Sequence, residues 1–173
     1  MKKIAAAVLL TVLAASPAYA TLKVGDKAPE FSAKDQTGKS WDLKHVEGAK
    51  VVLLYFYPKD DTPGCTTEAC NFRDDYSAYA EIGVTILGVS PDSPKSHLKF
   101  KQKHHLPFTL LADEDHAICE AYNVWGQKKF MGREYMGVLR TTFIIDPQGN
   151  IKKVFENVKP AEHSTELLAA IKA

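Results

Sequence analysis

The sequence has few of the features that mark several classes of protein. Only three of its 173 residues are cysteines, too few for a scaffold held by disulfides. Its 22 basic and 21 acidic residues nearly balance, which excludes a strong electrostatic case for binding nucleic acid. Repeats, linkers and low-complexity stretches are also absent. What is present is an ordinary globular composition, 45% hydrophobic and 25% charged, in a length that suits one domain.

The longest apolar run is too short for a transmembrane helix. As a helix, residues 4–15 would extend about 18 Å, against a bilayer core of about 30 Å. Two lysines precede this run and Ala18-Tyr19-Ala20 follows it as a small-residue cleavage site, the order found in secretory signals. We therefore expect residues 1–20 to be a cleavable signal peptide. The mature domain, residues 21–173, would be exported to the bacterial periplasm without a membrane anchor.

A strand, a helix and a strand follow one another in the first half of this domain. Residues 50–57 form a continuous apolar run that Pro58 ends, a pattern typical of a buried central strand. Thr62 suits the N-cap of a helix over residues 63–80, in which apolar residues recur at helical spacing. Residues 83–89 form a second apolar strand. The three elements predict a right-handed parallel crossover.

The second half of the domain predicts three helices and three strands. The helices cover residues 94–104, 113–122 (capped by Asp113) and 162–172, and the strands cover residues 107–111, 140–146 and 151–158. The last two strands are joined by Pro147-Gln148-Gly149-Asn150, a composition typical of a hairpin turn. Together these elements predict a three-layer α/β domain of thioredoxin-like fold, with a central mixed β-sheet flanked by helices.

Cys65 is the residue with the clearest chemistry. It takes the third position of the helix that follows Thr62, where backbone N–H groups lack partners and the helix dipole is positive. Both effects favour a thiolate over a thiol, and Gly64 leaves room for a small substrate beside the sulfur. The carboxylates of Asp60 and Asp61 oppose this effect. They must therefore point outward or be outweighed by a cation.

Cys70 follows five positions after Cys65. In an intact helix the two Cα atoms would lie about 8.7 Å apart, beyond the roughly 4.4–6.8 Å that a disulfide needs. Cys70 is therefore either incidental or reaches Cys65 only after the start of the helix unwinds. We expect no metal site, because the spacing lacks the paired C-x2-C motifs of zinc sites and the cysteine spacing of iron–sulfur sites.

Other candidate residues have a structural alternative. Arg140 opens an apolar strand, where a guanidinium is unfavourable unless it is paired, so it either faces the Cys65 thiolate or pairs with a surface carboxylate. We expect Cys119 to be a buried bystander, with a second redox-active thiol as the alternative. His104 and His105 would point about 100° apart on a helix, so a solvated helix end is favoured over a metal pair.

The segment Phe56-Tyr57-Pro58-x-x-x-Thr62-Pro63-Gly64-Cys65-Thr66 carries the pattern P-x-x-x-T-x-x-C of the peroxiredoxins. With Cys70 five residues further on, the chain resembles the bacterioferritin-comigratory, or Q-type, branch of that family. The similarity covers almost all of residues 26–172, and its other matching segments are 110–116, 124–126, 130–132 and 140–146.

The resemblance implies that Cys65 is the peroxidatic cysteine and that Cys70 is the resolving cysteine, which joins it in a transient disulfide. It implies that Thr62 and Arg140 bind the peroxide. Pro58 would shield the pocket, and Glu68 would support the site. Such an enzyme reduces hydrogen peroxide and organic hydroperoxides through a sulfenic acid. A thioredoxin-like dithiol protein then reduces it again. The resemblance also implies antioxidant defence, a monomer and no bound cofactor.

Two other functions are open on the same fold. A thiol–disulfide oxidoreductase would use a C-x-x-C pair instead of the C-x4-C of Cys65 and Cys70, and it would not require Thr62 or Arg140. A copper-binding chaperone would use a different cysteine spacing and a later histidine. Retention of zinc or copper after purification would favour that second function.

Overall fold

The computed structural model of the protein describes residues 22–43 and 51–172. The predicted signal peptide, residues 1–20, and the predicted first residue of the mature domain, Thr21, lie outside the described residues. Within the two described ranges, no helix is both long enough and apolar enough to cross a membrane.

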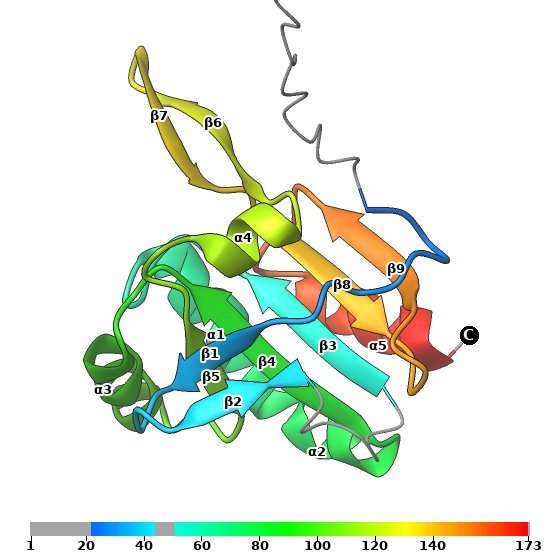
Figure 1. The fold of residues 1–173 in the computed structure, drawn as a ribbon. Coiled ribbons are helices and arrows are strands. Elements are labelled where there is room, and N and C mark those ends of the chain that lie inside the picture. Colours follow the sequence, from blue (N-terminus) through cyan, green and yellow to red (C-terminus); the bar gives the residue numbers. More distant parts are fainter. Residues whose placement is uncertain (1–21, 44–50, 173) are drawn as a thin grey trace, which may run out of the picture.

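A seven-stranded mixed sheet forms the middle of the molecule (Figure 1). Its strand β3 (Val51–Phe56) pairs in parallel with β4 (Val84–Ser90) and antiparallel with β8 (Thr141–Ile145). The order across the sheet is β2-β1-β5-β4-β3-β8-β9, where the further strands are β1 (Ser32–Asp35), β2 (Ser40–Asp42), β5 (Thr109–Ala112) and β9 (Ile151–Glu156). The predicted central mixed sheet is confirmed, with small shifts at the strand ends.

Strand β3 is buried on both faces, as its continuous apolar sequence predicts. Successive side chains of a strand point to opposite faces of the sheet. Leu53 and Tyr55 accordingly join one apolar cluster, and Leu54 and Phe56 join the cluster on the other face. Each fully buried side chain of this kind contributes about 1.5–3 kcal/mol. One strand thus stabilises both layers.

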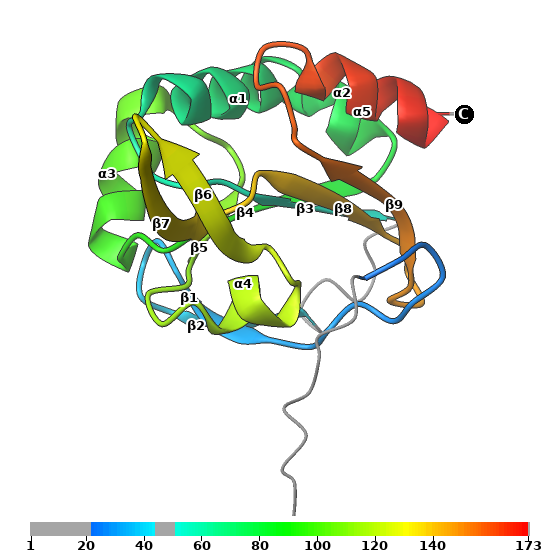
Figure 2. The same ribbon diagram turned by 90° about the horizontal axis from the view of Figure 1, so that it is seen from above.

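Helices cover both faces of the sheet (Figure 2). On one face lie α1 (Pro63–Asp74), α2 (Tyr76–Glu81) and α5 (His163–Lys172), and on the other lies α4 (Ala117–Ala121). Helix α3 (Pro94–His104) packs against β5 and buries Phe100 in the same cluster as α1. The predicted three-layer α/β architecture of the thioredoxin-like fold is therefore confirmed.

The helix predicted over residues 63–80 is in fact two helices. The chain leaves helical geometry at Asp75 (φ −93°, ψ 5°) between α1 and α2. The Asp75 carboxylate accepts a hydrogen bond of 2.6 Å from the Ser164 hydroxyl in α5. A short polar side chain held by another helix favours a break here over a continuous helix.

The helix predicted over residues 113–122 is also shorter than expected, since only α4 is helical. Asp113 lies before the loop that precedes α4, but its side chain still binds the N–H groups at the start of this helix. Its two carboxylate oxygens each accept a hydrogen bond of 2.8 Å, from the backbone N–H groups of Ile118 and Cys119. The intervening residues form a loop that returns the chain to the start of α4.

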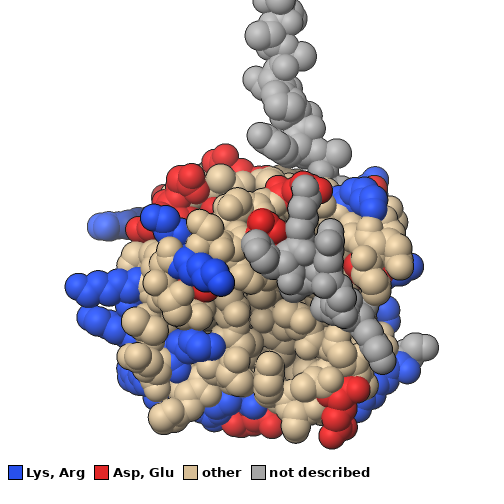
Figure 3. Space-filling model, turned by 60° about the horizontal axis from the view of Figure 1, so that its bottom comes forward, with Lys and Arg blue, Asp and Glu red and all other residues tan. Residues whose placement is uncertain are grey.

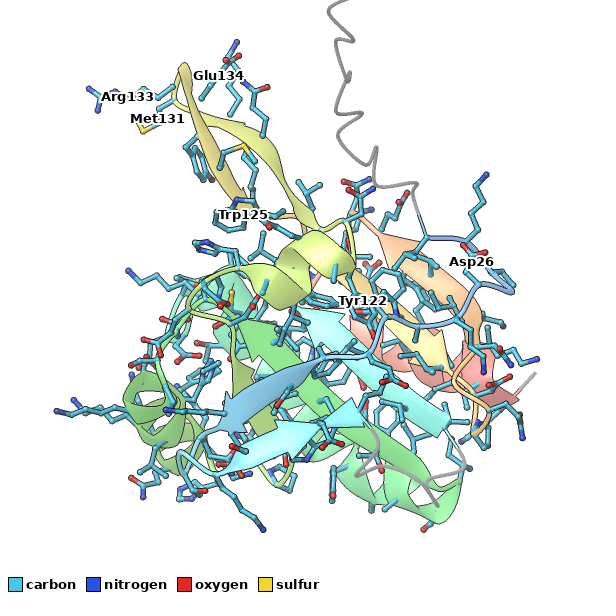
Figure 4. The ribbon with its side chains drawn as sticks, viewed as in Figure 1. Asp26, Tyr122, Trp125, Met131, Arg133 and Glu134 are labelled. Atoms are coloured by element: carbon cyan, nitrogen blue, oxygen red, sulfur yellow. The ribbon has the colours of Figure 1, made fainter. Side chains whose placement is uncertain are left out.

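Two hairpins, β1–β2 and β6–β7, are not predicted by the sequence pattern. Strands β6 (Trp125–Phe130) and β7 (Arg133–Val138) form a separate two-stranded sheet that projects from the body of the molecule (Figures 1 and 4). Its tip carries Met131, which is 87% exposed, together with Arg133 and Glu134. Most of β7 faces solvent, so it lacks the alternation of buried and exposed residues from which a strand is predicted.

Helix α3 gives the molecule a basic side. Lys95, Lys99 and Lys103 are exposed, and Figure 3 shows positive side chains gathered along the side on which α3 lies in Figure 1. Lys101 is half-buried, and its ammonium donates to the carbonyl oxygen of Phe108. Burial lowers the pKa of Lys101.

Candidate active site

Cys65 lies at the third residue of α1, as predicted. Thr62 is the N-cap residue, with extended backbone (φ −84°, ψ 149°), and Pro63 is the first helical residue. Cys65 is only 1% exposed and belongs to the apolar cluster that contains Tyr55 and Phe72. Apolar burial by itself disfavours an anionic sulfur, so a thiolate here needs a cation beside it.

Arg140 supplies that cation. Its Nη2 lies 3.2 Å from the Cys65 sulfur, and its Nη1 donates to the Glu68 carboxylate. Thr141, which follows Arg140, pairs with Phe56 at the end of β3, and this register brings the guanidinium to the start of α1. The two interpretations of Arg140, contact with the Cys65 thiolate and an ion pair with a carboxylate, are therefore both partly correct. It faces the sulfur and it also forms an ion pair, but with a buried carboxylate and not a surface one.

Glu68 holds the guanidinium in place and is itself 1% exposed. Burial raises the pKa of Glu68 to about 7, because the attraction of Arg140 offsets the loss of hydration only in part. Among the described residues its second oxygen, Oε1, has no hydrogen-bond partner. The signal for this residue in the sequence is its spacing, since an acid three positions after Cys65 lies on the same face of a helix.

Asp60 points inward, so of the two alternatives for this carboxylate the outward orientation does not hold. Its carboxylate accepts hydrogen bonds from the hydroxyls of Tyr57 (2.8 Å) and Ser96 (2.7 Å) and lies 3.0 Å from His97 Nδ1. Nε2 of His97 faces the carbonyl oxygen of Leu111 at 3.1 Å. Both ring nitrogens thus lie within hydrogen-bond distance of an oxygen. The Asp60 carboxylate is held by Tyr57, Ser96 and His97, away from the Cys65 sulfur.

The three other predicted pocket residues surround the start of α1. The predicted N-cap position of Thr62 is confirmed, but its hydroxyl donates to the carbonyl oxygen of Lys59 at 3.0 Å and its side chain does not bond to the first turn of the helix. A Cβ atom on Gly64 would lie 3.7 Å from Arg140 Nη2, which shows that the guanidinium borders the space beside this glycine. Pro58 is half-buried in the loop after β3.

The structure does not bring Cys70 to Cys65. Both are free thiols in the same helix. Cys70 is half-buried, and its sulfur lies 4.0 Å from Nδ1 of His104 at the end of α3. The side chain of His104 is only 18% exposed, so the expectation of a solvated helix end is wrong for this residue and holds for His105, which is exposed.

Cys119 lies in α4 and is fully buried, which confirms its predicted burial. Burial raises the pKa of this thiol well above its usual range. In residues 22–43 and 51–172, no group of three or more histidine, cysteine or acidic side chains is placed to hold a metal ion.

A cysteine and an arginine in contact at a helix start, on a thioredoxin-like scaffold, define a thiol-dependent redox enzyme. Comparison with known protein families identifies one of them: the model of the AhpC/TSA family matches residues 24–154. The chain belongs to this family and, by its relatives, to the peroxiredoxins of the Bcp/PrxQ type.

The similar proteins agree on this assignment. Peroxiredoxin Bcp of Bacillus subtilis is 49% identical over 152 residues, which cover 88% of this chain and 96% of that protein. Peroxiredoxin Bcp of Escherichia coli is 46% identical over 151 residues, 87% of this chain and 96% of that protein. The structure of the Xanthomonas campestris bacterioferritin comigratory protein, described for its alkyl peroxide reduction activity, has a TM-score of 0.79 at 35% identity and covers 88% of this chain and 97% of that one.

These findings make the chain a thiol peroxidase. The family implies a peroxide substrate and a thiol reductant. Family membership favours this activity over the two alternatives, a thiol–disulfide oxidoreductase and a copper chaperone. Neither alternative would require the contact between Cys65 and Arg140.

Glu68 should make the stability of the protein depend on pH. Its pKa is about 7 in the folded protein against an ordinary value of 4.5, so the folded state binds this proton more tightly. The stabilisation is full below pH 4.5 and is lost as the pH rises through 7, by up to about 3 kcal/mol. Urea unfolding should therefore show Glu68→Gln, which mimics the protonated acid, gaining stability relative to the wild type over this range.

The matched control for this measurement is Glu134→Gln at the exposed tip of the β6–β7 hairpin. The difference in free energy of unfolding between Glu134→Gln and the wild type should stay constant with pH. A constant or shrinking advantage of Glu68→Gln would contradict the assignment of a raised pKa to Glu68.

Proposed function

We propose that the protein is a periplasmic peroxidase of antioxidant defence that reduces hydrogen peroxide and organic hydroperoxides, with Cys65 as the peroxidatic and Cys70 as the resolving cysteine. The observation that carries the proposal is the 3.2 Å contact between Arg140 Nη2 and the buried Cys65 sulfur. A guanidinium at this distance favours the thiolate, which is the nucleophile. The alkyl peroxide reduction of the Xanthomonas campestris relative supports including organic hydroperoxides.

The first step is attack of the Cys65 thiolate on one peroxide oxygen. An S–O bond forms and the O–O bond breaks, so the cysteine becomes a sulfenic acid and the other oxygen leaves as water or an alcohol after taking a proton. Negative charge grows on the leaving oxygen, where Arg140 stabilises it with little reorganisation. The Thr62 hydroxyl donates to Lys59, which leaves its oxygen free to accept the peroxide hydrogen, and Pro58 shields the pocket.

The second step joins Cys65 to Cys70 in a disulfide and requires the start of α1 to unwind. One feature weakens this end: Thr62 provides no side-chain cap for the unpaired N–H groups of the first turn. The middle of the helix is held more firmly, because Phe72 is fully buried and Asn71 Nδ2 donates to the backbone of the segment before α5 at 3.0 and 3.2 Å. Opening one helix end costs far less than global unfolding.

A thioredoxin-like dithiol protein then reduces the disulfide by thiol–disulfide exchange, and the enzyme acts as a monomer without a cofactor or membrane anchor. Export rests on the signal pattern of residues 1–20.

The chemistry can be tested by mapping the disulfide. Cys65 and Cys70 fall in one tryptic peptide, residues 60–73. When reduced protein receives one equivalent of hydrogen peroxide, mass spectrometry should show this peptide losing two hydrogens without joining another. Cys65→Ser should consume no peroxide, whereas the matched control Cys119→Ala should cycle normally. A peptide joined to Cys119 would overturn the role of Cys70, and three unmodified thiols would overturn the mechanism.

Removal of the guanidinium should slow the first step. Loss of one preorganised donor to the transition state costs about 10²–10³ in rate, so Arg140→Met should lower the rate constant for oxidation of Cys65 by that factor. Stopped-flow measurement of the first turnover gives this constant directly. Arg133→Met, the same substitution at the exposed hairpin tip, serves as the control. An unchanged rate in Arg140→Met would show that the arginine has only a structural role.

Export predicts a defined processing product. When the full chain is produced in a Gram-negative host, the periplasmic fraction should contain a protein whose N-terminal residue is Thr21. Replacing the small residues of the cleavage site, as in Ala18→Phe with Ala20→Phe, should block cleavage and leave a longer precursor. An uncleaved wild-type chain found only in the cytoplasmic fraction would refute the export proposal.

A further inference from the structure

Outside the pocket of Cys65, three chemically complementary side chains come together from separate segments. Cys70 lies in the middle of α1, His104 at the end of α3, and Asp61 in the loop that precedes α1. The Cys70 sulfur is 4.0 Å from His104 Nδ1, and His104 Nε2 is 3.0 Å from Asp61 Oδ1. A thiol, an imidazole and a carboxylate in this order form the arrangement in which a third group orients the base that activates a nucleophile.

Asp61 determines which nitrogen of His104 carries the proton. Hydrogen bonds from Lys103 (2.9 Å) and from His104 hold the pKa of Asp61 below its usual range, so the carboxylate is ionised at neutral pH and only accepts. His104 Nε2 therefore donates, and in the neutral ring Nδ1 presents its lone pair to Cys70. The Asp61 backbone adopts a left-handed conformation (φ 55°) at this position.

Packing keeps the imidazole in this orientation. The Phe100 ring meets it edge-on, with centroids 5.1 Å apart and planes at 69°. The backbone carbonyl of His104 accepts a 3.0 Å hydrogen bond from Arg73 Nη1, which ties the end of α3 to α1. The charged and titratable groups that face Cys70, directly or through a neighbour, are His104, Arg73 with Asp74, and Asp61 with Lys103.

We propose that His104 is the general base of the resolution step, in which Cys70 attacks the sulfenic acid of Cys65. His104 Nδ1 takes the thiol proton as the Cys70 sulfur forms the S–S bond and the S–O bond breaks. The leaving hydroxide takes that proton from the imidazolium and departs as water, so His104 ends neutral. The Cys70 sulfur is oxidised and the sulfenic sulfur is reduced, without any further reactant. This inference rests on the proposed function and adds a residue to it.

The same contacts indicate which cysteine moves. Cys70 lies in the half of α1 that Phe72 and Arg73 hold against the sheet and against α3. Cys65 lies in the first turn, which has the weaker hold. The unwinding turn therefore carries the sulfenic acid to a stationary pair of Cys70 and His104.

Rapid mixing with hydrogen peroxide separates oxidation of Cys65 from formation of the disulfide. At neutral pH, His104→Asn should slow disulfide formation by about 100-fold or more, because general base catalysis is worth at least this factor. Asp61→Asn should slow the same step by a smaller factor. His105→Asn changes the exposed neighbour at a left-handed position that asparagine tolerates, and it should form the disulfide at the wild-type rate.

Chemical rescue distinguishes a base from a merely structural residue. Added imidazole should restore disulfide formation in His104→Ala in proportion to its concentration. Without imidazole, the rate in this variant should rise about tenfold per pH unit over the neutral range, because only thiol already ionised by solvent reacts. The wild-type rate should rise less steeply over the same range.

The outcomes separate this inference from the proposed function. Disulfide formation at the wild-type rate in His104→Asn, or slow formation in His104→Ala that imidazole does not restore, would overturn the role of His104 and leave the Cys65–Cys70 disulfide standing. Absence of that disulfide in the wild-type protein would overturn the proposed function itself.

Discussion

The contact between the Arg140 guanidinium and the Cys65 sulfur joins two segments that are 75 residues apart in the chain. It matters because the sulfur is buried among apolar side chains, where an anion is stable only beside a cation. The guanidinium is largely buried in turn and requires a carboxylate, which Glu68 supplies from the next turn of α1. The start of the helix, the end of β3 and the beginning of β8 therefore depend on one another.

The two thiols of α1 occupy different environments although they are five residues apart. Cys65 faces the sheet beside Arg140, whereas Cys70 turns toward α3 and meets His104. Helical geometry separates them, so each thiol has its own neighbour, Arg140 for Cys65 and His104 for Cys70. A helix that is weakly capped at one end and firmly packed in its middle suits a reaction that must bring these two sulfurs together.

Much of the fold follows from local patterns. The apolar run of residues 50–57 predicts the buried strand β3, and the order of the elements around it predicts the mixed sheet. The break between α1 and α2 at Asp75 cannot be predicted from local patterns, because it depends on a hydrogen bond from Ser164 in another helix. The β6–β7 hairpin does not follow either, since a hairpin that projects into solvent carries little of the burial alternation that identifies strands.

The sequence by itself determined the reactive cysteine at a helix start, the parallel crossover and the family motif around Cys65, because these depend on residue order, local propensity and periodicity. Only the tertiary structure decided that Glu68 would be buried against Arg140, that His97 would contact Asp60, and that His104 would lie against Cys70. The physical reason is that burial and charge pairing arise between segments distant in the chain. Their meeting depends on strand order and helix packing, which no local pattern contains.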